Sequence, residues 1–115
     1  MRLAQIGFGG LGSLVAGQLA RDAAIQFVGV AARQSQRERI RAVLGAVPIV
    51  ETPQALLALG PEIVVECASQ EAFRQYAEPV LAAGIDLIAV SVGVLAEAEY
   101  RERVLAAARK GGAVF

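Results

Sequence analysis

The sequence predicts an α/β fold, in which helices cover both faces of a doubly wound parallel sheet of about six strands. Short aliphatic runs alternate with segments of helical periodicity, and the connections between them are short. Hydrophobic residues make up 56% of the chain and aromatic residues only 5%, so the core is expected to be aliphatic, as in parallel strands buried on both faces. A glycine cluster also follows the first strand directly, where such a strand turns into a helix.

Strands and helices are expected to alternate along the whole chain. The expected strands are residues 2–6, 25–31, 47–50, 63–67, 86–91 and 113–115. The expected helices are residues 10–21, 35–44, 53–59, 70–83 and 96–110. Pro48 predicts an edge or irregular third strand, and Pro79 is expected to kink or split the fourth helix. Ser35, Thr52 and Ser69 are candidate N-caps.

The 115 residues are enough for one domain with its own core, and no repeat or linker divides them. We therefore expect a single domain over residues 1–115. Because the chain ends in what reads as a strand, we expect it to be the N-terminal part of a longer protein. A C-terminal substrate and catalytic domain would then be absent from this chain.

Charge and cysteine content restrict the partners and the compartment. With 11 basic and 11 acidic residues the net charge is zero, so we expect no nucleic-acid partner and no membrane partner. Cys67 is the single cysteine, which excludes an internal disulfide and favours a reducing compartment. The N-terminus does not read as a signal peptide and no run could span a bilayer, so a cytoplasmic location is expected.

The chain contains no histidine, which is the commonest general acid–base side chain. We therefore expect no catalytic residue in this segment, and we expect no metal site.

The glycine cluster reads G-x-G-x-x-G at Gly7, Gly9 and Gly12. In a dinucleotide site Gly7 allows the tight turn, Gly9 lets the backbone approach a pyrophosphate, and Gly12 lets the helix pack close to the sheet. The helix N-terminus then offers unpaired N–H groups to the phosphates. Because the motif follows a strand and precedes a helix, it favours a Rossmann-type nucleotide site over a merely structural turn.

Ligands of open α/β sheets lie across the carboxyl ends of the strands. Four loops are expected there, at residues 7–12, 31–35, 67–70 and 91–95. The residues expected to contact the cofactor are Gly7, Phe8, Gly9, Gly10, Leu11, Gly12, Ala32, Arg33, Cys67, Ala68, Ser69, Ser91, Val92 and Gly93.

The loop after the second strand bears on the choice between NAD and NADP. An NAD site usually carries an acidic residue about 20 positions beyond the glycines. Here Ala31 and Ala32 stand at those positions, and Arg33 follows. We hypothesise that Arg33, with help from Ser35 or Arg37, holds a 2′-phosphate, so that NADP binds at least as well as NAD. The alternative is that Arg33 merely solvates the loop.

Other polar residues near these loops have simpler interpretations. Cys67 reads as a small packing residue near the cofactor, because Glu66 beside it disfavours a reactive thiolate. Glu66 reads as a buried, hydrogen-bonded carboxylate with a structural role. Ser69 could also face the nicotinamide side, and Gly93 indicates either close approach of the backbone or a turn.

Several runs resemble the L-aspartate dehydrogenases. They are IVVECASQEA at residues 63–72, continuing to Tyr76, LAAGIDL at residues 81–87, SVGVLA at residues 91–96, and the opening IGFGGLG at residues 6–12. The glycine motif is generic, whereas the VECAS run and the serine-x-glycine loop are more specific. Homoserine dehydrogenases and dihydrodipicolinate reductases are related alternatives.

The resemblance implies an enzyme that oxidises L-aspartate to iminoaspartate with NAD or NADP. The imine would be hydrolysed to oxaloacetate and ammonia or would enter NAD biosynthesis. It also implies an N-terminal Rossmann domain, a C-terminal domain with a catalytic histidine, and a homodimer at full length. Ala31 departs from the acidic residue that many members carry there. A standalone nucleotide-binding module for redox sensing or dimerisation is the alternative from another class.

Overall fold

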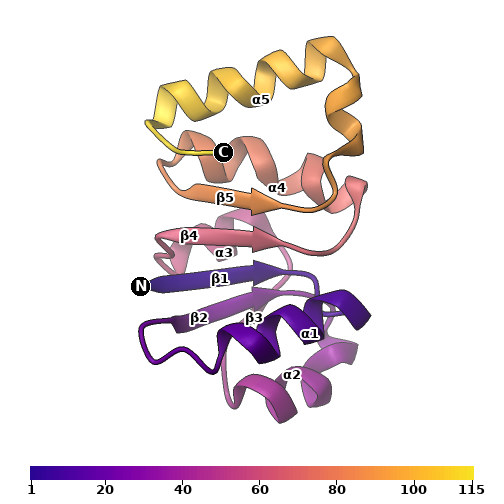
Figure 1. Cartoon of the computed structure of the whole chain (residues 1–115), viewed down its shortest axis with the longest axis vertical. Helices are drawn as coiled ribbons and strands as arrows, with labels where there is room; N and C mark the ends of the chain where they lie inside the picture. Colours follow the sequence, from indigo (N-terminus) through magenta and orange to yellow (C-terminus); the bar gives the residue numbers. More distant parts are fainter.

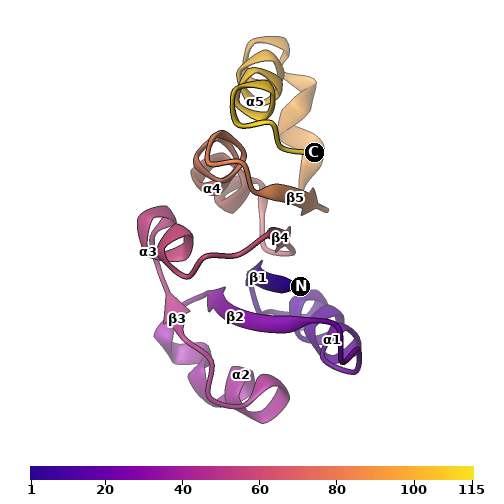
Figure 2. The ribbon, with the colours of Figure 1, turned by 90° about the vertical axis from the view of Figure 1, so that its left-hand side faces the viewer.

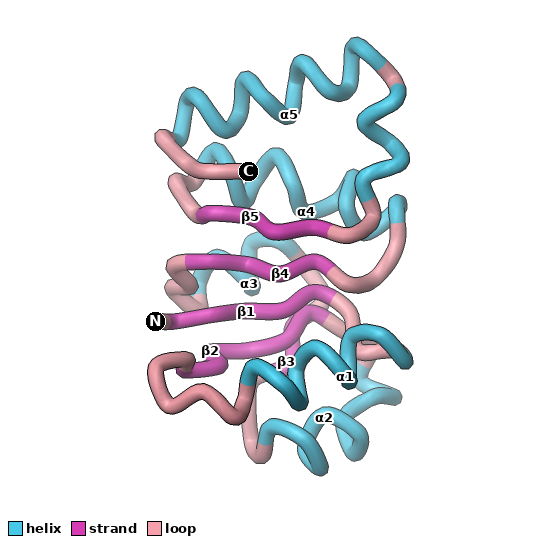
Figure 3. The backbone as a smooth tube through the Cα atoms, in the orientation of Figure 1, coloured by secondary structure: helices cyan, strands magenta, loops and turns pink.

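The computed structural model describes residues 1–115, and its centre is a five-stranded parallel sheet (Figures 1 and 3). The strand order is β3-β2-β1-β4-β5, and every pair of neighbours is parallel. The strands are β1 (Arg2–Ile6), β2 (Gln26–Ala31), β3 (Ile49–Val50), β4 (Ile63–Glu66) and β5 (Asp86–Ala89). The predicted doubly wound α/β class is therefore confirmed.

Helices lie on both sides of this sheet, with α1 on one side and α3 and α4 on the other (Figure 2). α2 packs against α1, and α5 packs against α4 beyond the β5 edge. The helices are α1 (Gly10–Leu19), α2 (Arg37–Leu44), α3 (Pro53–Ala58), α4 (Gln70–Ala82) and α5 (Ala98–Gly111), with the 3₁₀ turns η1 (Gln34–Gln36) and η2 (Val92–Ala96). No helix is long and apolar enough to cross a membrane.

The order of the strands places a switch point beside β1. From β1 the chain winds outward through β2 to β3, and α3 then carries it across to β4 on the other side of β1. Ile6 pairs with Ala31 on one neighbour and with Glu66 on the other, so three strands end at the same level. The loops that follow β1, β2 and β4 therefore meet at one edge of the sheet.

The predicted sixth strand, residues 113–115, is not formed. The backbone N–H of Leu87 donates to the carbonyl of Val114 at 3.0 Å, as a sixth strand beside β5 would require. The N–H of Val114, however, donates to the side chain of Asp86 at 2.8 Å. Without a second backbone bond no ladder forms, and the sheet has five strands where about six were expected.

Pro79 does not split α4, contrary to one of the two outcomes expected from the sequence. Proline lacks the N–H that would bond to the carbonyl one turn earlier. Its neighbours Ala77, Val80 and Leu81 are almost fully buried in the main core, and this packing holds the helix across the missing bond.

Two of the three predicted N-caps are confirmed. The Oγ1 of Thr52 accepts from the N–H of Ala55, and the Oγ of Ser69 accepts from the N–H of Ala72. Ser35 is not a cap, because it lies inside η1, and Arg33 in an extended conformation precedes that turn. The polar loop after β2 thus closes as a 3₁₀ turn before α2 begins at Arg37.

Candidate functional site

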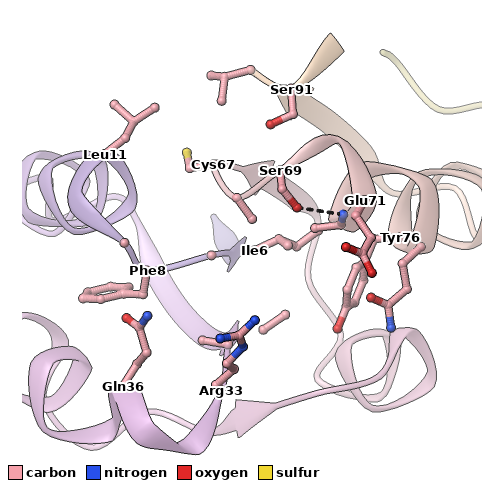
Figure 4. A pocket seen from close by; sticks show the side chains of 18 of the residues that line it. Ile6, Phe8, Leu11, Arg33, Gln36, Cys67, Ser69, Glu71, Tyr76 and Ser91 are labelled. Carbon is pink, nitrogen blue, oxygen red and sulfur yellow. Dashed lines mark hydrogen bonds between the residues drawn. The ribbon is translucent and has the colours of Figure 1, made fainter. Parts of the chain in front are cut away.

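A cavity of about 670 Å³ opens at the carboxyl edge of the sheet, next to the switch point (Figure 4). Its size is typical of small-molecule and cofactor pockets. Most of the residues singled out from the sequence line it. They are Gly7, Phe8, Gly9, Gly10, Leu11, Ala32, Arg33, Cys67, Ala68, Ser69 and Ser91.

Three of the residues expected at the site do not line the cavity. Gly12 is buried beneath the turn, and a Cβ there would lie 2.7 Å from the carbonyl oxygen of Gly7. Val92 is 44% exposed in η2. Gly93 packs on the side chain of Gln70, and a Cβ at this position would collide with its Nε2. The loop after β5 therefore reaches the cavity through Val90 and Ser91.

The glycine turn has a geometry that side chains would obstruct. Gly7 has φ +91°, and a Cβ at this position would lie 2.6 Å from the Cβ of Ala68. The turn after β1 therefore packs directly on the loop after β4. A Cβ at Gly9, by contrast, would meet nothing within 4 Å. That open space faces the cavity and leaves the backbone accessible to a ligand, as expected from the motif.

Gln5, which is fully buried on β1, holds this turn from below. Its Nε2 donates to the carbonyl of Gly7 at 2.9 Å and to the carbonyl of Gly12 at 2.8 Å. Sequence reasoning missed Gln5, although a polar residue inside an apolar strand just before the glycines was a signal. The Gln5 amide holds the turn through the carbonyls of Gly7 and Gly12, and it bonds to none of the N–H groups of the turn.

The first N–H groups of α1 have no partner within the protein. The N-cap Gly9 has no side chain, and Gly10, Leu11 and Gly12 precede the first intrahelical bond, which Ser13 donates to the Gly9 carbonyl at 2.9 Å. These N–H groups and the positive end of the helix dipole form an anion-binding end beside the cavity.

Glu66 is the last residue of β4, and it is only 1% exposed. Its Oε2 accepts from the N–H of Ala68 at 2.7 Å, the N–H of Ser69 at 3.1 Å and the Oγ of Ser91 at 2.8 Å. Its Oε1 accepts from the N–H of Ser91 at 3.0 Å. One carboxylate thus joins the loop after β4 to the loop after β5, and the buried, hydrogen-bonded state expected from the sequence is confirmed.

Arg33 lies at the opposite end of the cavity from Ser91 and Cys67 (Figure 4). Its side chain is exposed and makes no hydrogen bond or ion pair with the protein. Neither Ser35 nor Arg37 lines the cavity, and Arg37 instead donates to the side chain of Gln34 at 3.0 Å. Of the three residues considered for a phosphate, only Arg33 lines the cavity.

Sequence reasoning also missed several polar residues around the cavity. Gln36 lines it beside Phe8, and its Oε1 is buried without a partner (Figure 4). Glu51 follows β3 and supplies a carboxylate that the search after β2 could not find. The first two turns of α4 contribute Glu71, Ala72, Gln75 and Tyr76. The sheet order, which brings β3 and α4 to this edge, reveals Glu51 and the α4 residues, whereas Gln36 reaches the cavity from the 3₁₀ turn after β2.

Cys67 is 6% exposed and packs with Leu3 and Val65. Burial and the nearby charge of Glu66 both raise the pKa of its thiol, so it stays protonated at neutral pH. This agrees with the packing role expected from the sequence. Burial, with a smaller contribution from Glu51, likewise raises the pKa of Tyr76.

Known proteins resemble this chain in sequence over nearly its whole length. L-aspartate dehydrogenase 1 of Bordetella parapertussis is 44% identical over 114 residues, and the match covers 98% of this chain and 42% of that protein. The L-aspartate dehydrogenase of Pseudomonas aeruginosa is 34% identical over 116 residues, covering 97% of this chain and 43% of that protein. The resemblance to L-aspartate dehydrogenases is confirmed, and the chain spans less than half the length of these relatives.

Solved structures share the fold. A hyperthermophilic archaeal homoserine dehydrogenase in complex with NADPH superposes with a TM-score of 0.74 at 18% identity, over 99% of this chain and 42% of that one. Biliverdin reductase from Synechocystis, solved with biliverdin and NADP+, gives a TM-score of 0.79 at 18% identity, over 98% of this chain and 36% of that one. Residues 7–115 match the family described as "Homoserine dehydrogenase, NAD binding domain". The chain therefore belongs to this family of NAD-binding domains.

Proposed function

We propose that this chain is the coenzyme-binding domain of an NAD(P)-dependent L-aspartate dehydrogenase, which converts L-aspartate to iminoaspartate. The observation that carries the proposal is the cavity at the switch point, where the unpaired N–H groups at the start of α1 meet the loops after β2, β4 and β5. Bound NAD(P) would accept the hydride. The residues of this chain would bind the dinucleotide and orient its nicotinamide.

The substrate assignment is supported by the relatives from Bordetella parapertussis and Pseudomonas aeruginosa, both of which are named L-aspartate dehydrogenases. This chain has no histidine and matches 42% of the length of the Bordetella parapertussis relative. A second domain of the full-length enzyme would therefore supply the catalytic histidine, the substrate pocket and most of a homodimer interface. The exposed apolar side chains of Ile88 and Val90 would suit a face that another domain covers.

The test of the activity is a comparison of substrates with the full-length enzyme that carries this domain. We expect NAD(P)-dependent oxidation of L-aspartate, and little oxidation of L-homoserine under the same conditions. Turnover of L-homoserine in preference to L-aspartate would replace this proposal with the alternative enzyme of the family.

For the cofactor, we propose that NADP binds at least as well as NAD, with Arg33 holding the 2′-phosphate. The support is that the Arg33 guanidinium has no protein partner at the cavity and that β2 ends in Ala31 without a carboxylate. Glu51 is the counterargument, because its carboxylate lines the same cavity and would repel a phosphate.

Calorimetric titration of the chain with NADP+ and NAD+ measures whether the attraction of Arg33 for the 2′-phosphate outweighs the repulsion by Glu51. Arg33→Ala should weaken NADP+ binding at least about tenfold and leave NAD+ binding nearly unchanged, because charge-assisted bonds to phosphate are among the strongest. Arg37→Ala is the matched control, since Arg37 lies outside the cavity. A clear NAD+ preference that Arg33→Ala does not alter would sink this assignment.

A further inference from the structure

Glu66 is the most buried charged side chain of the molecule, and its carboxylate accepts four hydrogen bonds from residues that line the cavity. Two of its partners, Ala68 and Ser69, follow it closely in sequence, whereas Ser91 lies 25 residues further along the chain. The two loops that carry these partners, residues 67–69 and 90–91, line the cavity. One carboxylate therefore links the two loops, in addition to the backbone bond from the Val90 N–H to the Glu66 carbonyl at 3.2 Å.

The partners of Glu66 fit an ionised carboxylate. Three of the four hydrogen bonds come from backbone N–H groups, which can only donate, and they reach both oxygens. Each oxygen accepts from at least one of these N–H groups, and an ionised oxygen is a stronger acceptor than a protonated one. The arrangement is thus matched to a negative charge that is kept in place by preorganised donors.

This charge lies behind the loops that form one end of the cavity. The loops that Glu66 joins stand opposite Arg33 (Figure 4), and β1, which leads into the glycine turn, lies between β2 and β4 in the sheet. If the dinucleotide lies across the strand ends with its adenosine toward Arg33 and its phosphates on the α1 N-terminus, its nicotinamide reaches the loops after β4 and β5. The nicotinamide ring is positively charged when oxidised and neutral when reduced.

We propose that Glu66 is a positioning residue that fixes the two loops around the nicotinamide and, through its charge, favours the oxidised over the reduced cofactor. The inference rests on the proposed cofactor site and adds to it a preference for one redox state. Glu66 acts through Ala68, Ser69 and Ser91, whose backbone it orients, and through its electrostatic field. The hydride acceptor is then bound more tightly than the product of hydride transfer.

The test uses Glu66→Gln in this chain and three ligands. They are the oxidised and reduced forms of whichever cofactor the wild type binds more tightly, and its nicotinamide-free fragment, ADP-ribose or the 2′-phosphate of ADP-ribose. We expect the variant to bind the oxidised form about tenfold more weakly, and the reduced form about threefold more weakly. Binding of the fragment should change less than about twofold, because the fragment does not reach the loops.

Val64→Ala is the matched control, because Val64 is fully buried on the same strand but packs in the main core away from the cavity. It should leave the ratio of oxidised to reduced affinity unchanged. If Glu66→Gln does not fold, Glu66→Asp retains the charge and shortens the reach. Glu66→Asp should weaken the binding of the oxidised and the reduced dinucleotide equally, so that the ratio of their affinities stays the same. Binding of the fragment should not change.

An unchanged ratio of the two affinities in Glu66→Gln, or an equal loss for all three ligands, would overturn the inference while leaving the cofactor site intact. A changed ratio in Glu66→Asp, or a loss of fragment binding there, would also overturn it. A wild-type chain that binds none of the ligands would instead overturn the proposed function, and this inference with it.

Discussion

Gln5 and Glu66 are the two polar side chains buried in the sheet, and they organise opposite sides of one cavity in opposite ways. They lie on adjacent strands, since β1 and β4 pair Gln5 with Val65 and Ile6 with Glu66. Gln5 donates to two carbonyls of the glycine turn, whereas Glu66 accepts from the N–H groups of the loops after β4 and β5.

The difference decides which chemistry each side offers to a ligand. On the β1 side an amide occupies carbonyls, and the N–H groups at the start of α1 are available for phosphates because Gly9 has no side chain to cap them. On the β4 side a carboxylate occupies N–H groups and adds a negative charge. A dinucleotide with anionic phosphates and a cationic oxidised ring is complementary to both sides at once.

The largest expected effect on stability is that of Glu66→Ala. It leaves the N–H groups of Ala68, Ser69 and Ser91 without their acceptor, and it should lower the free energy of unfolding by about 3 kcal/mol. Gln5→Ala should cost about 2 kcal/mol, because Gln5 makes only two bonds and its Oε1 has no partner in the folded state. Urea denaturation of the two variants measures the difference. A Gln5 variant less stable than the Glu66 variant would contradict this ranking.

The contact between the two sides is tested by Gly7→Ala. The substitution places a Cβ 2.6 Å from the Cβ of Ala68 in a residue with φ +91°, so it should cost about 2 kcal/mol and push the two loops apart. Cofactor affinity should fall as well. Gly9→Ala is the control for stability, because its Cβ meets nothing within 4 Å. Equal stability of the two variants would argue against a packed contact at Gly7.

The two confirmed helix caps, Thr52 and Ser69, should contribute equally to stability but differently to cofactor binding. Thr52→Ala and Ser69→Ala each remove one acceptor for the third N–H of a helix, and each should cost about 1 kcal/mol in thermal unfolding. Only Ser69 lines the cavity, so only Ser69→Ala should also weaken cofactor binding. If Thr52→Ala weakened binding to the same extent, the effect would come from stability and not from the site.

The smallest effect concerns the Cys67 thiol. Because burial and Glu66 raise its pKa, the folded chain holds the thiol proton more tightly than the unfolded chain does. Stability should therefore decrease as the pH rises above the unfolded thiol's pKa, at about 8.5, and alkylation at pH 8 should be slow.

In Glu66→Gln the contribution of the Glu66 charge is removed, so the pH dependence of Cys67 alkylation should move to lower pH. An unchanged pH profile would mean that burial alone raises the pKa.

Much of the fold follows from local sequence patterns. Alternating apolar runs, the glycine turn, the caps at Thr52 and Ser69 and the aliphatic composition predicted the doubly wound sheet and the elements that form it. The expectations that failed depended on partners distant in sequence. Whether residues 113–115 form a strand depends on Asp86, which takes the N–H of Val114, and the continuity of α4 at Pro79 depends on core packing.

The same division holds for the site. The glycine turn and the loop residues after β2, β4 and β5 could be placed because parallel strands end at one edge. Glu51, Gln75 and Tyr76 could not, because only the strand order and the position of α4 bring them to the cavity. Glu66 was recognised as a buried acceptor, but its role as the link to Ser91 required the paired ends of β4 and β5.

The most direct test of the account is an NMR titration that follows backbone amide signals of the chain, first with the nicotinamide-free fragment and then with the intact oxidised cofactor. The amides of Gly10 and Leu11 should shift with both ligands, because both carry the phosphates. The amides of Ala68 and Ser91 should shift only with the intact cofactor. Equal shifts of Ala68 and Ser91 with the fragment, or unmoved signals of Gly10 and Leu11, would contradict the division of the cavity into a donor side and an acceptor side.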